Sequence, residues 1–240
     1  MKAETQQKMA QAMASGFGMP LEIALQPGTT LVEGEKKKAD SWNTLFPVGE
    51  QVRLVLAPDL IQPVKDVLAA LPAGHRLTVD DLKAAWGDNA IEVGTEEFYV
   101  LEEDGFKPFT PAEPAIARQL TADDQAAFEA FQAACPQVDV DTADVGLDHE
   151  AAFGVLDGER IVAVASGYEW IGCLDVGILT DPAYRGQGMG KAAVSACCAY
   201  FLPKERPVFY RHETDNVGSG KIAVALGYTH LATVYSFRRV

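Results

Sequence analysis

The stretch Asp175-Val-Gly-Ile-Leu-Thr-Asp-Pro-Ala-Tyr-Arg-Gly-Gln-Gly-Met-Gly-Lys191 organises the second half of the chain. An apolar run through Ile178 and Leu179 predicts a strand that ends at Asp181-Pro182, and three glycines then precede an Ala-rich stretch that predicts a helix. Glycine accepts unusual backbone angles, so such a turn can direct several N–H groups toward one anion. The helix start adds its own N–H groups and the positive end of its dipole. The stretch therefore predicts a cradle for a pyrophosphate.

The spacing of the glycines excludes two common phosphate loops. A Walker loop ends in Gly-Lys followed by Ser or Thr, whereas Ala192 follows Lys191 here. A dinucleotide fingerprint counted from Gly186 or Gly188 needs a final glycine where Lys191 and Ala193 stand. What remains is Arg-Gly-x-Gly-x-Gly behind Asp-Pro-x-Tyr.

This pattern resembles the coenzyme A loop of the GNAT superfamily of acyl-CoA-dependent N-acyltransferases. A second block, Asn216-Val-Gly-Ser-Gly-Lys-Ile-Ala-Val-Ala-Leu-Gly-Tyr228, is similar to the family's later motif, in which an Asn precedes a helix ending at Leu-Gly-Phe or Leu-Gly-Tyr. Asp215 or Asn216 can cap that helix, and Gly227 can end it. The two blocks are specific in combination, and the resemblance covers roughly the C-terminal half of the chain.

The resemblance implies an α/β (α+β) fold with a GNAT-like mixed, mostly antiparallel sheet flanked by helices. The sequence itself places a hairpin at Asp157-Gly158 and a boundary in the Pro-rich segment from Pro108 to Pro114. We therefore predict a GNAT-like acetyl-CoA-binding catalytic domain at 113–240. Residues 1–112 form an N-terminal α/β region, either a degenerate acyltransferase half or an unrelated cap. Periodicity and turn signals predict strands at 29–32, 51–57, 98–101, 116–120, 151–156, 160–165, 174–180, 208–211 and 228–239, and helices at 3–14, 58–68, 78–86, 121–135, 191–201 and 216–227.

Two segments are expected to lack a helix. Residues 19–25 read as a short extended piece, and 139–148 reads as an acidic loop. In the family that this chain resembles, the second segment lies near the acceptor site. Its Asp139, Asp141 and Asp144 are therefore candidates for attracting an amine.

Composition narrows the class of protein. The chain of 240 residues carries a formal net charge of −14 and lacks an apolar run long enough for a signal peptide or a membrane span. We expect a soluble, cytoplasmic protein that does not bind nucleic acid, because the lysines at 36–38 form the only basic tract. The four cysteines lack a Cys-x-x-Cys pattern, so we expect packing roles and no metal. The acidic surface either attracts a cationic amine or serves solubility alone.

The resemblance implies acetyl-CoA (coenzyme A) as co-substrate and assigns residues to hold it. Asn216 and Ser219 match the second motif, where they either contact the pantetheine arm or only cap the helix. The backbone of the strand would align the pantetheine, and main-chain N–H groups of the turn would bind the pyrophosphate with an arginine nearby. In this sequence those residues are Ile178, Leu179, Thr180, Arg185, Gly186, Gln187, Gly188, Met189, Gly190 and Lys191.

The sequence offers several candidates for the proton-transfer residues. Many family members place a tyrosine where this chain has Ala223, so another tyrosine or water would protonate the leaving thiolate. Tyr210 is our candidate acid, with Tyr228 and Tyr235 as alternatives. Asp175, on the strand that would lie next to the cofactor, is our candidate base, and the alternative is a solvent-facing strand aspartate without a catalytic role. Further alternatives are His149, Glu150 and Glu169.

Together these observations predict an N-acetyltransferase that moves an acetyl group from acetyl-CoA to a primary amine of a small molecule or peptide. The amine would attack directly in a ternary complex. Without the usual tyrosine, a catalytically silent CoA or acyl-CoA sensor stays open as an alternative. Another acyl chain or a hydroxyl acceptor is a third reading. A homodimer is compatible with the sequence.

Overall fold

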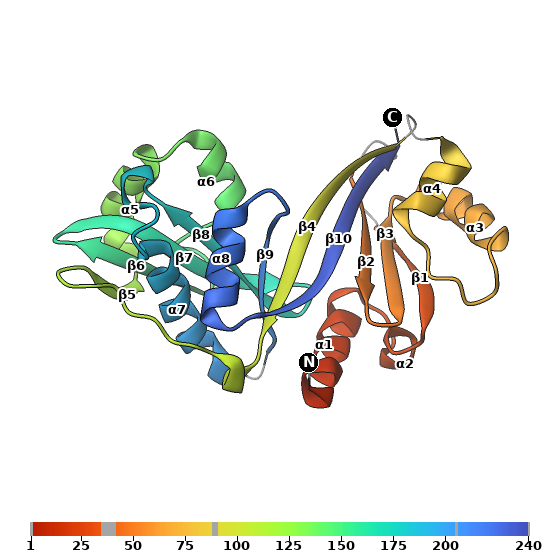
Figure 1. Cartoon of the computed structure of the whole chain (residues 1–240), viewed down its shortest axis with the longest axis horizontal. Coiled ribbons are helices and arrows are strands. Elements are labelled where there is room, and N and C mark those ends of the chain that lie inside the picture. The colour runs from red at the N-terminus through yellow and green to blue at the C-terminus, as the bar shows by residue number, and fades with distance from the viewer. Residues whose placement is uncertain (1, 35–41, 88–90, 205, 240) are drawn as a thin grey trace.

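The structure, a computed structural model, describes residues 2–34, 42–87, 91–204 and 206–239. This part of the chain forms one mixed, mostly antiparallel sheet with helices on its faces (Figure 1), as the sequence predicted. Parallel pairing occurs between β1 and β3 and between β8 and β9. In spatial order the strands are β1 (Gly28–Glu33), β3 (Gln51–Leu56), β2 (Asn43–Val48), β10 (Thr229–Arg239), β4 (Ile91–Leu101), β9 (Val208–Glu213), β8 (Cys173–Thr180), β7 (Arg160–Trp170), β6 (Ala151–Asp157) and β5 (Ile116–Leu120).

The helices pack on the sheet through separate apolar clusters. α7 and α8 cover one face of the C-terminal strands, and small residues in α7, such as Ala192 and Ala193, allow close approach to the sheet. α1 contributes Met9 and Met13 to a cluster that reaches β4 and β9. The helices are α1 (Ala3–Gly16), α2 (Leu21–Ala24), α3 (Ile61–Ala69), α4 (Val79–Trp86), α5 (Gln125–Ala133), α6 (Gln137–Ala143), α7 (Met189–Phe201) and α8 (Val217–Leu226).

Two of the predicted irregular segments contain helices. Residues 21–24 form α2, and Pro20 is its N-cap residue. The carbonyl oxygen of Ala24 accepts a hydrogen bond from the buried Arg53 guanidinium. Residues 137–143 form α6, which starts after Pro136 and ends at Asp144 in a left-handed conformation. Both predictions were wrong because contacts with distant segments stabilise helices too short to be stable alone.

The sequence did not predict β2. Pro47 weakens its strand signal, yet β2 pairs with β3 along its length. Its register with β10 covers only residues 43–45, so the missing N–H of Pro47 costs no hydrogen bond on that side. Pairing with remote strands therefore decides this element. The lysine tract at 36–38 lies outside the described residues.

The centre of the sheet joins the two ends of the chain. β4 lies between β9 and β10, and in Figure 1 the long strands β4 and β10 run side by side between the two groups of helices. β4 precedes the predicted boundary at 112/113, whereas both of its neighbours follow it. The backbone pairing thus crosses that boundary, and the division into 1–112 and 113–240 stays a prediction.

Candidate functional site

The sheet opens between β8 and β9. These two strands pair in parallel only at Leu174↔Val208 and Asp175↔Phe209. Beyond that point β8 continues along β7 to Thr180, and β9 continues along β4 to Glu213. Within the described residues, the facing edges 176–180 and 210–213 therefore have no strand partner across the opening. Such edges offer main-chain donors and acceptors to an extended ligand.

The predicted glycine turn lies at the end of β8, beside this opening. A short η5 helix (Pro182–Tyr184) follows β8, and α7 begins at Met189. Gly188, the N-cap of α7, has φ 86°, a value that disfavours any side chain. Gly190 allows α7 to approach β8, because a Cβ there would lie 2.6 Å from the Thr180 hydroxyl oxygen. The two glycines therefore set the turn and the helix against the strand.

The N-terminus of α7 is uncapped. No described side chain caps it, and its first turn contains no acidic residue. The first N–H groups of a helix lack intrahelical partners and carry the positive end of the dipole. Met189, Gly190 and Lys191 lie in this turn. The binding of an anion by their N–H groups stays a prediction.

The side chains around the turn have partners of their own. Arg185 contacts the Asp139 carboxylate at 2.6 Å and donates to the Thr180 carbonyl oxygen. Gln187 donates to the Ala183 carbonyl oxygen at 2.9 Å. The Arg185 side chain is 51% exposed, so its ion pair is worth little and an anionic ligand can compete for the guanidinium.

Phe109 borders the glycine turn, and sequence reasoning missed it. The Lys191 Nζ atom lies 3.5 Å from the centroid of the Phe109 ring. A Cβ atom at Gly188 would lie 3.2 Å from the nearest ring atom. The Phe109 N–H donates to the buried Ser195 hydroxyl of α7 at 2.8 Å. No signal in the sequence indicated that Phe109 would border the turn. Its place there depends on the packing of its segment against α7, which is remote in the chain.

The second predicted block forms α8 with the expected ends. The Asn216 side chain accepts from the Ser219 N–H at 3.1 Å, and Gly227 ends the helix with φ 89°. Asn216 is therefore a helix cap, one of its two predicted roles. The predicted contacts of Asn216 and Ser219 with a cofactor stay predictions.

Tyr210, the predicted acid, lies on β9 at the opening. Its side chain is fully buried in the cluster that also contains Ala223 and Tyr228. Burial raises the pKa of the Tyr210 phenol above its usual value. Among the described residues its hydroxyl oxygen makes no hydrogen bond of standard geometry, but the Ser219 side chain lies near enough to oppose part of the rise in its pKa. The structure thus brings a protonated phenol beneath α8, next to the position where the family's tyrosine is absent.

Asp175, the predicted base, is part of an ion-pair network on the other face of the sheet. Its Oδ2 accepts from Arg211 Nε at 2.6 Å and from the Tyr168 hydroxyl at 3.1 Å. Burial lowers the pKa of Arg211, but Asp175, together with Tyr168 and Glu96, raises it above its usual value. Arg211 also reaches Glu96 at 3.2 Å. Asp175 therefore has a cationic partner, and its role as a base stays a prediction.

A hollow of about 640 Å³ lies at the far end of β4 and β9. Glu96 contributes to its wall and links it to the Arg211–Asp175 pair. Two further carboxylates, Glu213 and Asp215, and the Trp42 indole also line it. This acidic lining suits a cationic ligand.

Three other features bear on the chemistry of the site. All four cysteines are buried thiols, in agreement with the packing role predicted for them. Across the described residues, no group of three or more His, Cys, Asp or Glu side chains is arranged to hold a metal ion. In the same part of the chain, every helix is too short or too polar to cross a membrane.

One comparison with known proteins identifies the family, and another supports the fold. The model of the "Acetyltransferase (GNAT) domain" matches residues 105–229. No curated protein matches the chain. Solved structures with this fold include a GCN5-related N-acetyltransferase-like protein from Streptococcus suis 89/1591, with TM-score 0.52, 14% identity and 99% coverage of each chain. A GNAT-family acetyltransferase from Colwellia psychrerythraea matches with TM-score 0.52 and 15% identity, covering 80% of this chain and 77% of that one.

A GCN5-related N-acetyltransferase from Sphaerobacter thermophilus matches with TM-score 0.52 and 17% identity, covering 79% of this chain and 71% of that one. At such identities these structures establish the fold alone. The family model covers both motif blocks, and it begins after β4.

Proposed function

The chain belongs to the GNAT acetyltransferase family, and from that premise we propose that it transfers an acetyl group from acetyl-CoA to a primary amine of a small molecule or peptide. Both substrates would be bound together, and the amine would attack directly. The observation that carries this proposal is the opening between β8 and β9 beside the uncapped start of α7. An extended arm and a pyrophosphate need such a strand edge and helix terminus side by side.

The cofactor-holding residues are proposed from this geometry. The N–H groups of the turn from Gly186 to Lys191 would bind the pyrophosphate, and Arg185 would exchange Asp139 for a phosphate oxygen. The backbone edge of 178–180 would pair with the pantetheine arm. When bound, acetyl-CoA supplies an activated acyl group as a thioester. An N–H of the same edge would stabilise negative charge on the acyl oxygen.

The acceptor amine is proposed to enter from the acidic hollow. Its carboxylates Glu96, Glu213 and Asp215 would attract a cation. Glu96 pairs with Arg211 on β9, so the hollow adjoins the edge of the opening. A positively charged amine would thus be concentrated beside the sheet. Tyr210, whose buried phenol stays protonated, is the proposed proton donor to the leaving thiolate.

A titration and an activity assay test this proposal. Acetyl-CoA or CoA at about 100 times its Kd should stabilise the protein by about 2.7 kcal/mol, seen as a rise in Tm. Free thiol should then appear when acetyl-CoA is mixed with a primary amine from a panel of diaminoalkanes, arylalkylamines and lysine-containing peptides. Absence of any Tm shift with either ligand would refute the proposed cofactor.

The residue at position 223 favours a second candidate function, a CoA or acyl-CoA sensor. Ala223 occupies the place where many family members have a tyrosine, so a CoA or acyl-CoA sensor is the alternative. A sensor would bind acetyl-CoA with the same Tm shift but release no thiol with any amine of the panel. The activity assay therefore separates the two functions.

A further inference from the structure

His212 has a buried proton acceptor without a partner. It lies on β9 two residues beyond Tyr210, on the same face of the sheet, and is 9% exposed. Its Nδ1 lies 2.7 Å from the Glu213 carbonyl oxygen, which can only accept. Nδ1 therefore carries the hydrogen, and Nε2 of the neutral ring is left with its lone pair. Nε2 has no hydrogen-bond partner among the described residues.

The surroundings of His212 hold this nitrogen in place. The imidazole stacks on Tyr99 with 5.5 Å between the ring centroids. On its other side lies Gly220 of α8, where a Cβ would come within 3.0 Å of Nε2. A buried, unpartnered polar atom costs about 1–3 kcal/mol. Two such atoms, the Tyr210 hydroxyl and His212 Nε2, follow each other along the unpaired edge of β9, so a ligand group in the opening would relieve both.

We propose that His212 is the general base of the acetyl transfer, an inference that rests on the proposed function. The amine nitrogen forms the new C–N bond while the thioester C–S bond breaks. The proton lost by the amine goes to His212 Nε2, and the departing thiolate takes the proton of the Tyr210 hydroxyl. Proton return from the imidazolium to the tyrosinate through solvent restores both residues, so the reaction consumes no other reactant.

His212 meets the requirements of a base better than Asp175 does. The Oδ2 atom of Asp175 accepts hydrogen bonds from Arg211 and Tyr168, so protonation of this carboxylate would weaken its ion pair with Arg211, although its Oδ1 atom has no partner among the described residues. His212 Nε2 is not part of an ion pair, so its protonation breaks no existing contact. On the strands beside the imidazole, the titratable groups in register on its face of the sheet are Glu97 and Tyr99 on β4 and Tyr210 on β9. Lys221 follows Gly220 on α8, and His230 on β10 lies against Tyr99.

The test compares His212→Gln and Asp175→Asn in the full chain. For each, kcat and kcat/KM are measured from about pH 6 to about pH 9 with acetyl-CoA and the most active amine of the panel, and the Kd of CoA is measured by calorimetry. We expect His212→Gln to lower kcat about 10²–10⁴-fold near neutral pH and to remove the acidic limb of the profile, with the Kd of CoA unchanged. Asp175→Asn should keep that limb. His75→Gln, a matched change in the N-terminal region, should retain the wild-type rate and profile.

The possible results distinguish failure of the proposed acetyl transfer from failure of the role assigned to His212. If the wild type releases no thiol with any amine, the proposed function fails and this inference with it. If the wild type turns over and His212→Gln keeps its rate and acidic limb, only the inference is overturned. It is also overturned if His212→Gln weakens CoA binding while kcat at saturation and the acidic limb persist, because His212 would then hold the pantetheine arm. Circular dichroism confirms that the variants are folded.

Discussion

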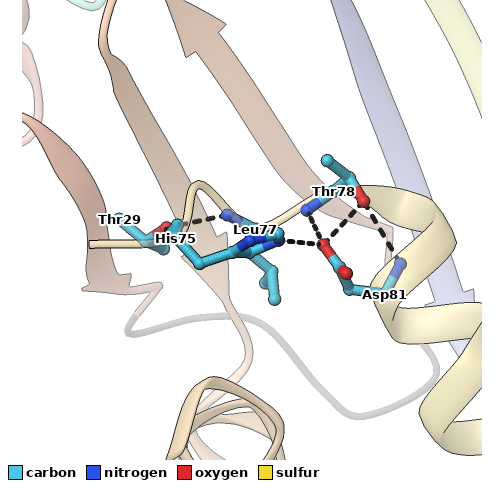
Figure 2. A network of polar contacts seen from close by, with 5 residues as sticks. All are labelled: Thr29, His75, Leu77, Thr78 and Asp81. Carbon is cyan, nitrogen blue, oxygen red and sulfur yellow. Dashed lines mark hydrogen bonds and ion pairs between the residues drawn. The ribbon is translucent and has the colours of Figure 1, made fainter. Parts of the chain in front are cut away.

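Two helices of this protein begin in opposite ways. The start of α4 is occupied by the chain's own side chains: Thr78 accepts from the Asp81 N–H, and the Asp81 carboxylate accepts from the Thr78 N–H. Figure 2 shows this reciprocal cap together with His75, which contacts Asp81 at 2.9 Å. The start of α7 has a glycine N-cap, a lysine at the third helical position and no side-chain cap.

The two helices differ in whether their first N–H groups have side-chain partners. A capping box and first-turn carboxylates satisfy the unpaired N–H groups of α4 and complement its dipole. Thr29 extends the same network, since its hydroxyl donates to the His75 carbonyl oxygen and accepts from the Leu77 N–H (Figure 2). α4 is therefore complete without a ligand, whereas α7 leaves the same groups available to an anion.

The largest effect is expected when α7 is given the acid that α4 has. Lys191 is the third residue after the N-cap Gly188, the position that Asp81 occupies after Thr78. Lys191→Glu replaces a cation beside the proposed pyrophosphate site by a carboxylate that would compete for the same N–H groups. Together these changes should weaken CoA binding by about 3 kcal/mol, or roughly 100-fold, in a calorimetric titration.

Lys191→Gln is the control for this prediction. It removes the charge and the cation–π contact with Phe109 without adding an acid, so its loss of affinity should be much smaller. Equal affinities of Lys191→Glu and the wild type would show that α7 does not hold the pyrophosphate.

A smaller effect is expected at α4. Thr78→Ala removes the side-chain cap and should lower the free energy of unfolding by about 1 kcal/mol in a denaturant titration. The affinity for CoA should not change, because α4 belongs to the other region. Thr78→Ser keeps the hydroxyl and should restore most of the stability. A loss of CoA affinity in Thr78→Ala would contradict the independence of the two helix starts.

The smallest effect concerns the pH dependence of the same cap. Burial raises the pKa of Asp81, but hydrogen bonds from Thr78 and His75 outweigh it and leave the pKa below its usual value. The folded state therefore binds the Asp81 proton less well than the unfolded chain. Its stabilising contribution is present above the unfolded pKa of about 3.9 and is lost as pH falls through the lower folded pKa. The stability difference between wild type and Asp81→Asn should shrink over that range, and a constant difference would contradict this assignment.

Local patterns were enough for the predicted elements whose signals lie within a few residues. The caps Thr78 and Asn216, the hairpin at Asp157-Gly158 and the end of α8 at Gly227 all appear where the sequence predicted them. Each depends on hydrogen bonds or backbone angles between near neighbours, which sequence alone displays. α2, α6 and β2 lack that property, since remote segments stabilise them.

The site divides along the same line. The turn from Arg185 to Lys191 was recognisable because glycine spacing and the helix start are adjacent in sequence. Nothing in the sequence indicated that Asp175 would contact Arg211, 36 residues away, or that Phe109 would border the turn. Side-chain partners across strands depend on register, and register is a property of the whole sheet.

The resemblance to the family could be recognised from two motif blocks in the sequence. The glycine turn and the order of strands and helices around it were also predictable, because backbone requirements and periodicity act within short segments. Three features could not be read from the sequence: β4 lies between β9 and β10, β8 and β9 separate after Asp175, and Gly220 leaves room for His212. Those features depend on strand pairing and side-chain packing between residues far apart in the chain. Such contacts contribute free energy only when the sheet has formed.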